Sequence, residues 1–156
     1  MAKIYLILTD GKNVLVAKGG KSGNPPKVRG GYHLPGGKYE SRDKNSLGTV
    51  IRELKEETGI TLKNPQQLGK DLTPENTGGA KFVIVQTESV PDWVEWFDKL
   101  DEADRPKVTN IYDEPFTGLI SLPLENCWKD NNFNNTFYTD YFGLGLKEAC
   151  KILGKD

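Results

Sequence analysis

The chain has 156 residues, a formal net charge of −1 and 36% hydrophobic residues, which is the composition of an ordinary globular protein. This charge creates no general attraction for nucleic acid polymers or anionic membranes, and no apolar run approaches the length of a membrane span. The N-terminal apolar run is too short and wrongly flanked for a signal peptide, so we expect a cytoplasmic protein. The length of the chain is typical of a single domain, which we expect over residues 1–156. Cys127 and Cys150 have no metal-ligand spacing and predict a reduced pair.

The first elements in chain order are two short strands. β-branched and aliphatic residues predict strands over residues 3–9 and 14–18, and Asp10-Gly11 between them predicts the tight turn of a hairpin. Residues 19–31 are rich in glycine, proline and basic residues, and predict a mobile loop.

The next element is a helix over residues 46–58. Ser46 is a suitable N-terminal cap, and Gly59 suits a left-handed C-terminal cap. Apolar residues spaced three and four apart form one stripe that we expect to face a core: Leu47, Val50, Ile51 and Leu54.

The second half of the chain alternates strands and helices. The pattern predicts, in order, strands over 69–73 and 80–90, a helix over 91–106, a strand over 116–124 and a C-terminal helix capped by Thr139 or Asp140. In the helix over 91–106, Trp93, Trp96 and Phe97 share one face. Aromatic residues at this spacing pack in a core or stack on a nucleobase, and the sequence leaves both interpretations open.

The end of the helix over 46–58 carries an unusual cluster of carboxylates. Glu53, Glu56 and Glu57 are three or four residues apart, so they project from neighbouring positions where the helix dipole also disfavours negative charge. A bound divalent cation would reverse both effects, because hard cations prefer carboxylate oxygens. The alternative is a solvated acidic face. Gly36 and Gly37 lie upstream, and with no Cβ they let the backbone approach a metal or a phosphate closely.

These residues resemble a known family signature. "GGKYESRDKNSLGTVIRELKEETGI" is similar to the signature of the Nudix hydrolases, and its second half is complete from Arg52 to Ile60. The first half departs from the pattern. Aligning Gly37 with the signature glycine places Asp43 at the position of the first glutamate and requires one extra residue before the helix, which a loop accommodates at low cost.

The resemblance implies an α/β fold, a Nudix-type α/β/α sandwich with a mixed central β-sheet. It also implies hydrolysis of a diphosphate linkage by water attack at a phosphorus, with Mg²⁺ or Mn²⁺ as cofactor. The metal ligands implied are the Gly36 carbonyl, Glu53, Glu56 and Glu57, with Arg52 orienting the cluster. Glu57, or an acid from a later loop, would accept the proton. Glu114 is either an additional acidic ligand or a solvated loop residue.

The partner expected from the resemblance is a small nucleotide. Nucleotide sugars, ADP-ribose and (deoxy)nucleoside triphosphates remain open as substrate classes, and a homodimer is kept open because many relatives dimerise. Gly37, Lys38 and His33 are candidate substrate-binding residues, and the alternative for His33 is a packed or hydrogen-bonded loop histidine. Basic residues before the signature form either a phosphate-attracting rim or scattered solvated charges: Lys18, Lys21, Lys27 and Arg29. A catalytically inactive, Nudix-like nucleotide-binding or regulatory domain is the alternative function.

Overall fold

The computed structural model describes residues 3–107, 115–125, 127–128 and 137–155. A six-stranded sheet has the order β6-β7-β1-β2-β8, and β5 also pairs with β1. The strands of this sheet are β1 (Lys3–Thr9), β2 (Asn13–Lys18), β5 (Gly36–Lys38), β6 (Gln66–Gln67), β7 (Lys81–Gln86) and β8 (Gly118–Pro123). The helices are α1 (Ser46–Thr58), α2 (Val90–Asp98) and α4 (Asp140–Ile152), with 3₁₀ turns η1 (Ser41–Asp43) and η2 (Glu102–Asp104). Because β1 and β7 are parallel and the other pairs antiparallel, the sheet is mixed.

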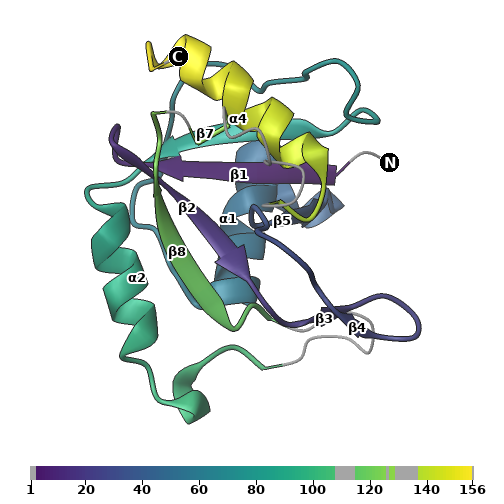
Figure 1. Cartoon of the computed structure of the whole chain (residues 1–156), viewed down its shortest axis with the longest axis vertical. Helices are drawn as coiled ribbons and strands as arrows, with labels where there is room; N and C mark the ends of the chain where they lie inside the picture. The colour runs from purple at the N-terminus through teal and green to yellow at the C-terminus, as the bar shows by residue number, and fades with distance from the viewer. Residues whose placement is uncertain (1–2, 108–114, 126, 129–136, 156) are drawn as a thin grey trace.

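Alternating residues along the strands build two cores, one on each face of the sheet. Leu6 and Leu8 of β1 pack with α1 and α2, whereas Ile7 between them packs with α4 on the opposite face. Figure 1 shows the same layers, with α4 in front of β1 and β7 and α1 behind the sheet. The predicted α/β/α sandwich with a mixed sheet is therefore confirmed.

Strand β1 changes partner along its length. Its first residues pair with β5, with Tyr5 opposite Gly36 and Lys3 opposite Lys38, while Thr9 at its other end pairs with Val14 of β2. β5 also contacts α1. This change of partner holds the two glycines against the helix that carries the carboxylates.

Helix α1 matches its predicted range, although its N-terminal cap differs from the prediction. The Asn45 side chain accepts a hydrogen bond from the Gly48 N–H at 2.8 Å, so Ser46 is the first helical residue and not the cap. Asn45 has the extended backbone that a cap requires, and its longer side chain reaches the free amide. Gly59 ends the helix with φ of +84°, as predicted.

Three other predictions from the sequence need correction. Residues 69–73 form no strand. Gly69 adopts a left-handed φ of +72°, and Leu72 makes only an isolated bridge to Phe82, while the short β6 precedes this segment. The segment 19–31, expected to be a loop, contains a short two-stranded ladder of β3 (Lys21–Ser22) and β4 (Lys27–Val28).

The helix predicted over 91–106 is the third correction. It begins at Val90 behind a Ser89 cap and ends at Asp98, followed by η2. Asp98, Asp101 and Glu102 near this end are disfavoured by the negative end of the helix dipole. The hairpin turn at Asp10-Gly11 and the strands on either side of it are confirmed, and Thr139 is the cap of α4.

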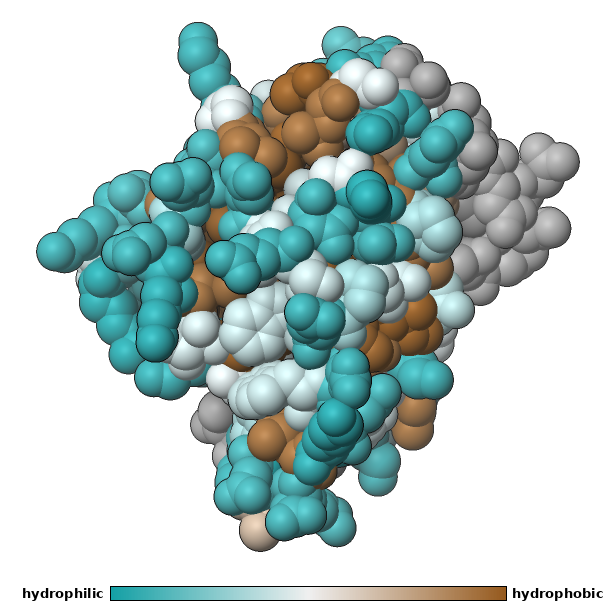
Figure 2. Space-filling view, turned by 90° about the vertical axis from the view of Figure 1, so that its left-hand side faces the viewer, coloured by the Kyte–Doolittle hydropathy of each residue, from teal (hydrophilic) through white to brown (hydrophobic). Residues whose placement is uncertain are grey.

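The surface adds two observations. Figure 2 shows that polar side chains cover most of the face on the left of Figure 1, and that apolar side chains appear there only as small patches. Within the described ranges, no helix has both the length and the apolar character needed to cross a membrane. Cys127 and Cys150 are not joined by a disulfide, and the Cys150 thiol donates to the Leu124 carbonyl.

Candidate active site

Most of the predicted site residues gather around one cavity of about 510 Å³. The members of the predicted set that line it are His33, Gly36, Gly37, Lys38, Glu53, Glu56 and Glu57. The cavity lies beside the junction of β1, β5 and α1. Glu114 falls outside the described residues, so its predicted role as a metal ligand stays a prediction.

One face of α1 packs in the core and another lines the cavity. Val50 and Leu54 are fully buried in the core under the sheet, whereas Glu53, Glu56 and Glu57 face the cavity. The helical repeat produces this division, because residues three and four apart share a face. The three carboxylates that are close in sequence are therefore also close in space, on the side of α1 that lines the cavity.

Arg52 joins the carboxylates to the loop before the helix. Its Nη1 donates to Glu53 Oε1 at 3.0 Å and to Glu56 Oε2 at 3.1 Å. Its Nη2 donates to the Lys38 carbonyl at 3.0 Å. The hydrogen bonds to Asp43, followed by the nearby glutamates, raise the pKa of the guanidinium above its already high ordinary value. Arg52 therefore neutralises part of the cluster, and its orienting role stays a prediction.

Asp43 is the anchor of this arrangement. Its buried carboxylate accepts two hydrogen bonds from Arg52, at 2.7 Å from Nε and 3.1 Å from Nη2. The Glu40 amide and the Thr49 hydroxyl donate to its second oxygen at 2.8 and 2.9 Å. The hydrogen bonds from Arg52 are the largest cause that lowers the pKa of Asp43 well below its usual range. Its contacts are those of a supporting residue that holds Arg52 in place.

The paired glycines bring the backbone against the carboxylates. The Gly36 N–H donates to Glu57 Oε1 at 2.9 Å. A Cβ on Gly37 would lie 2.6 Å from the Glu53 Cδ, so only glycine leaves room for this side chain. Both glycines therefore lie directly against the carboxylates of α1, and their predicted approach to a metal or a phosphate stays a prediction.

Glu53 has a raised pKa. Burial raises the pKa of Glu53 to about 7, and the neighbouring Glu56 adds to this, while Arg52 acts in the opposite direction. Desolvation disfavours the charged form of this carboxylate, and the nearby positive charge of Arg52 is not enough to offset it. A cation placed in the cavity would supply that charge.

The donor set fits a hard divalent cation in chemistry. Carboxylate oxygens with a backbone carbonyl nearby are the ligands that Mg²⁺ and Mn²⁺ prefer. Across the part of the chain that the structure describes, however, no three His, Cys, Asp or Glu side chains are grouped closely enough to hold a metal ion. The reason is visible in the contacts, since Glu53 and Glu56 turn to Arg52 and Glu57 turns to the Gly36 amide. A cation would compete with these two donors.

The rest of the cavity wall is aromatic and basic. Sequence reasoning missed several lining residues that come from distant segments: Lys3, Tyr5, Phe116, Tyr138, Thr139 and Phe142. Lys3 and Lys38 are directly opposite each other on β1 and β5, which places two like charges side by side at the cavity. Of the predicted basic rim, only Arg29 lines the cavity, with its guanidinium 4.5 Å from the centre of the Phe116 ring.

His33 is a packed residue that also lines the cavity. Its ring stacks on Tyr138 with centroids 4.4 Å apart, and its Nε2 is buried with no hydrogen-bond partner among the described residues. Burial, followed by the nearby charges of Arg29 and Lys3, lowers the pKa of His33 to about 4. The imidazole is therefore neutral at pH 7, so His33 contributes a ring surface to the cavity and no positive charge.

Comparison with solved structures finds the same fold in several proteins. A mutT/nudix family protein from Listeria innocua is 17% identical with a TM-score of 0.55, covering 98% of this chain and 92% of that chain. A C. elegans Ap4A hydrolase is 16% identical with a TM-score of 0.54, covering 97% and 98%. The NUDIX domain of Shewanella oneidensis NrtR, complexed with ADP ribose, is 16% identical with a TM-score of 0.50, covering 97% and 88%.

Sequence comparison gives the family. None of the curated proteins compared matches this chain. A family model described as the NUDIX domain matches residues 2–116, which include the whole signature segment from Gly36 to Ile60. Since that match spans most of the 156 residues, the chain belongs to the NUDIX family, which supports the predicted pyrophosphohydrolase activity.

Proposed function

We propose that this chain hydrolyses the diphosphate linkage of a nucleoside diphosphate joined to another moiety, with Mg²⁺ or Mn²⁺ as cofactor. One observation carries the proposal. Three carboxylates of α1 and the paired glycines of β5 line the same cavity as cationic and aromatic side chains. The acids suit a cation, and the cations and rings suit the phosphate and the base of a nucleotide.

In this proposal Glu53, Glu56 and Glu57 hold the metal with the Gly36 carbonyl. The bound cation supplies Lewis-acid neutralisation of the diphosphate charge. Arg52, held by Asp43, is proposed to orient the carboxylates until their oxygens turn to the metal. Glu57 is the proposed general base, and the Gly36 N–H fixes its Oε1 at 2.9 Å so that the carboxylate keeps a defined direction.

Substrate binding is assigned to other residues that line the same cavity. Lys38 and the Gly37 backbone lie beside the carboxylates and suit a phosphate, and His33 with Tyr138 offers a stacked, uncharged surface for a base. Lys3 and Arg29 would balance phosphate charge, which relieves the repulsion between Lys3 and Lys38. Nucleotide sugars, ADP-ribose and (deoxy)nucleoside triphosphates all satisfy these requirements.

The test is hydrolysis of a panel with one member of each class, with Mg²⁺, with Mn²⁺ and with neither. Glu56→Gln and Glu57→Gln should each reduce turnover by about a hundredfold or more, the usual loss when a group of this kind is removed. Glu95→Gln is the matched control, because Glu95 is an exposed glutamate of α2 that pairs only with Lys99 among the described residues. No turnover of any compound with either metal would contradict the proposal.

A second candidate is a Nudix-like binding or regulatory domain without catalysis. Two observations favour it, namely Asp43 in place of the first signature glutamate and the absence of a ready metal cluster among the described residues. The similar NrtR domain was solved with ADP ribose. Calorimetry separates the two functions, since a binding domain would take up ADP-ribose with Kd unchanged in Glu56→Gln and would not hydrolyse it.

We further propose that residues 1–156 form one domain. Helix α4 lies beyond the family match, yet its Phe142 and Leu146 pack with Phe82 and Ile84 of β7 in the core on one face of the sheet. Removing α4 would expose that core. A homodimer remains an expectation for sedimentation analysis to test.

A further inference from the structure

Tyr5 of β1 lines the active-site cavity, although it lies far from the signature segment in the sequence. Three neighbours hold its ring. It meets the Phe142 ring edge-on with centroids 4.9 Å apart at 83°, and the centre of the Phe82 ring is 5.7 Å away. It also lies against Gly36, where an added Cβ would come within 2.8 Å of the Tyr5 Cδ1. This packing limits the directions in which the phenol hydroxyl can point.

The Tyr5 hydroxyl is a hydrogen-bond donor near the carboxylates of α1. Tyr5 is directly opposite Gly36 in the β1–β5 ladder, and the Gly36 N–H donates to Glu57 Oε1 at 2.9 Å. Burial, followed by the nearby negative charge of Glu57, raises the pKa of Tyr5 to about 12. The phenol is therefore protonated at neutral pH. Among the described residues its hydroxyl makes no hydrogen bond, so this donor is available to a ligand.

Two lysines accompany this hydroxyl on the same face of the sheet. Lys3 is two residues before Tyr5 on β1, and Lys38 is directly opposite Lys3 on β5. Side chains two apart on a strand, and those directly opposite in a ladder, project from the same face. All three residues line the cavity. They form a row of donors with two positive charges, which suits the oxygens of a diphosphate.

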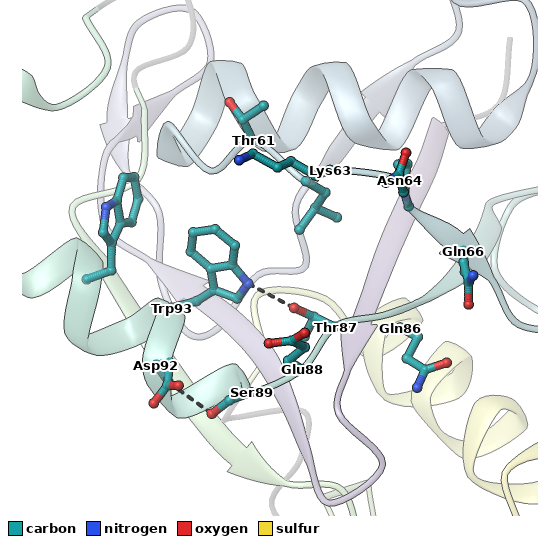
Figure 3. A pocket seen from close by; sticks show the side chains of 13 residues that line it. Thr61, Lys63, Asn64, Gln66, Gln86, Thr87, Glu88, Ser89, Asp92 and Trp93 are labelled. Atoms are coloured by element: carbon teal, nitrogen blue, oxygen red, sulfur yellow. Dashed lines mark hydrogen bonds between the residues drawn. The ribbon is translucent and has the colours of Figure 1, made fainter.

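Another cavity of the molecule, with a volume of about 670 Å³, lacks such a row (Figure 3). None of its lining residues lines the active-site cavity. Lys63 is the one cationic residue in its described lining, which also contains Glu88 and Asp92, so a phosphate would meet a net negative surface. Phe97 is fully buried and Trp93 packs against the same core, so the core interpretation holds for both. The donors for a diphosphate therefore lie in the active-site cavity.

We propose that the Tyr5 hydroxyl donates a hydrogen bond to a non-bridging phosphate oxygen of the substrate, beside Lys3 and Lys38. This role rests on the proposed function, because it needs a diphosphate in the active-site cavity. The lysines are flexible and supply charge, whereas the packed ring of Tyr5 supplies a donor with a defined direction. As an uncharged donor, Tyr5 also leaves the carboxylates free for a cation.

The test labels the hydroxyl-bearing carbon of all six tyrosines with ¹³C in the full chain, and the Tyr5 signal is assigned with Tyr5→Phe. Mg²⁺ is added to saturation, followed by methylene diphosphonate, a diphosphate analogue whose bridge cannot be hydrolysed. The diphosphonate should shift the Tyr5 signal further and saturably. The Tyr32 signal should stay in place, because Tyr32 packs on Phe137 and does not line the cavity.

Two variants connect the shift to the hydroxyl. Tyr5→Phe keeps the packed ring and should weaken binding of methylene diphosphonate about tenfold or more, the loss expected for one hydrogen bond to a charged group. Tyr32→Phe is the matched control and should bind like the parent. A Tyr5 signal that responds to Mg²⁺ but not to the diphosphonate, or equal affinity in Tyr5→Phe and the parent, would overturn the assignment.

Binding and turnover can fail separately. A parent that hydrolyses the panel compounds, with Tyr5→Phe binding the diphosphonate equally well, would contradict only the role of Tyr5. A parent that binds the diphosphonate through Tyr5 and hydrolyses no compound would support this role and contradict the proposed catalysis.

Discussion

Two adjacent glycines should respond to alanine in opposite ways. A Cβ on Gly36 would collide with the Ile4 carbonyl oxygen and lie 2.8 Å from the Tyr5 Cα, both of which are backbone atoms. A Cβ on Gly37 would instead meet the end of the Glu53 side chain, 2.6 Å from its Cδ. Backbone in the central strand cannot move aside, whereas a carboxylate can rotate. Gly36→Ala should therefore damage the fold, and Gly37→Ala should damage the site.

The magnitudes follow from the atoms that each methyl group meets. Overpacking against fixed backbone costs about 1–3 kcal/mol, which for a chain of this length lowers Tm by about 2–12 °C. Gly37→Ala should leave Tm within about 3 °C of the parent, since only a side chain moves. Displacing Glu53 by about 1 Å should lower kcat about a hundredfold, because catalytic groups tolerate little misplacement.

Thermal unfolding and kcat, measured on both variants with Mg²⁺, check this pair of expectations. Gly30→Ala is the control, because nothing lies within 4 Å of its Cβ position and its φ is not positive. An unchanged Tm in Gly36→Ala would refute the backbone argument. Full turnover in a folded Gly37→Ala would show that the Glu53 position does not matter for hydrolysis.

Three further predictions concern the helix, the ion pair and the metal. Asn45→Ala should lower stability by about 1 kcal/mol in urea unfolding through loss of the cap, and Ser46→Ala should cost less; the reverse order would contradict the assigned cap. Asp43→Asn should cost about 3 kcal/mol at pH 7 by leaving Arg52 without its buried partner. Folding lowers the pKa of Asp43, so the stability that its carboxylate contributes is complete above about pH 4 and is lost as the pH falls further. The difference in unfolding free energy between the parent and Asp43→Asn should therefore shrink at pH 2. A difference that stays constant with pH would refute the ion-pair explanation. Saturating Mn²⁺ with a diphosphate ligand should raise Tm by several degrees in the parent and much less in Glu56→Gln, and an equal rise in both would exclude Glu56 as a ligand.

Local patterns in the sequence predicted the framework of the molecule. The apolar stripe with Val50 and Leu54 placed α1 within its observed bounds, and Asp10-Gly11 identified the first hairpin. Both signals depend on residues close in sequence, which explains their success. The strand expected over 69–73 failed because alternation in a five-residue window does not show that Gly69 adopts a left-handed conformation.

The residues of the candidate site also differ in whether local sequence patterns could identify them. The sequence predicted that Glu53, Glu56 and Glu57 lie close together, because one helix carries them at contact spacing. Tyr138 and Phe142 were not found, since they reach the cavity only when α4 packs across the sheet from α1. No pattern around these residues marks them as site residues, because adjacent aromatic and polar positions near a helix start are common.

The carboxylate cluster shows why Arg52 and Asp43 belong together. Without a cation, Arg52 supplies the positive charge that lets Glu53 and Glu56 lie side by side. A metal that bound these acids would have to take them from Arg52, and the guanidinium would then need other negative charge. Asp43 supplies it through two hydrogen bonds to Arg52 that do not involve the cluster, and Glu40 pairs with the same guanidinium at 3.1 Å. A metal that bound at α1 would thus leave Arg52 paired with Asp43.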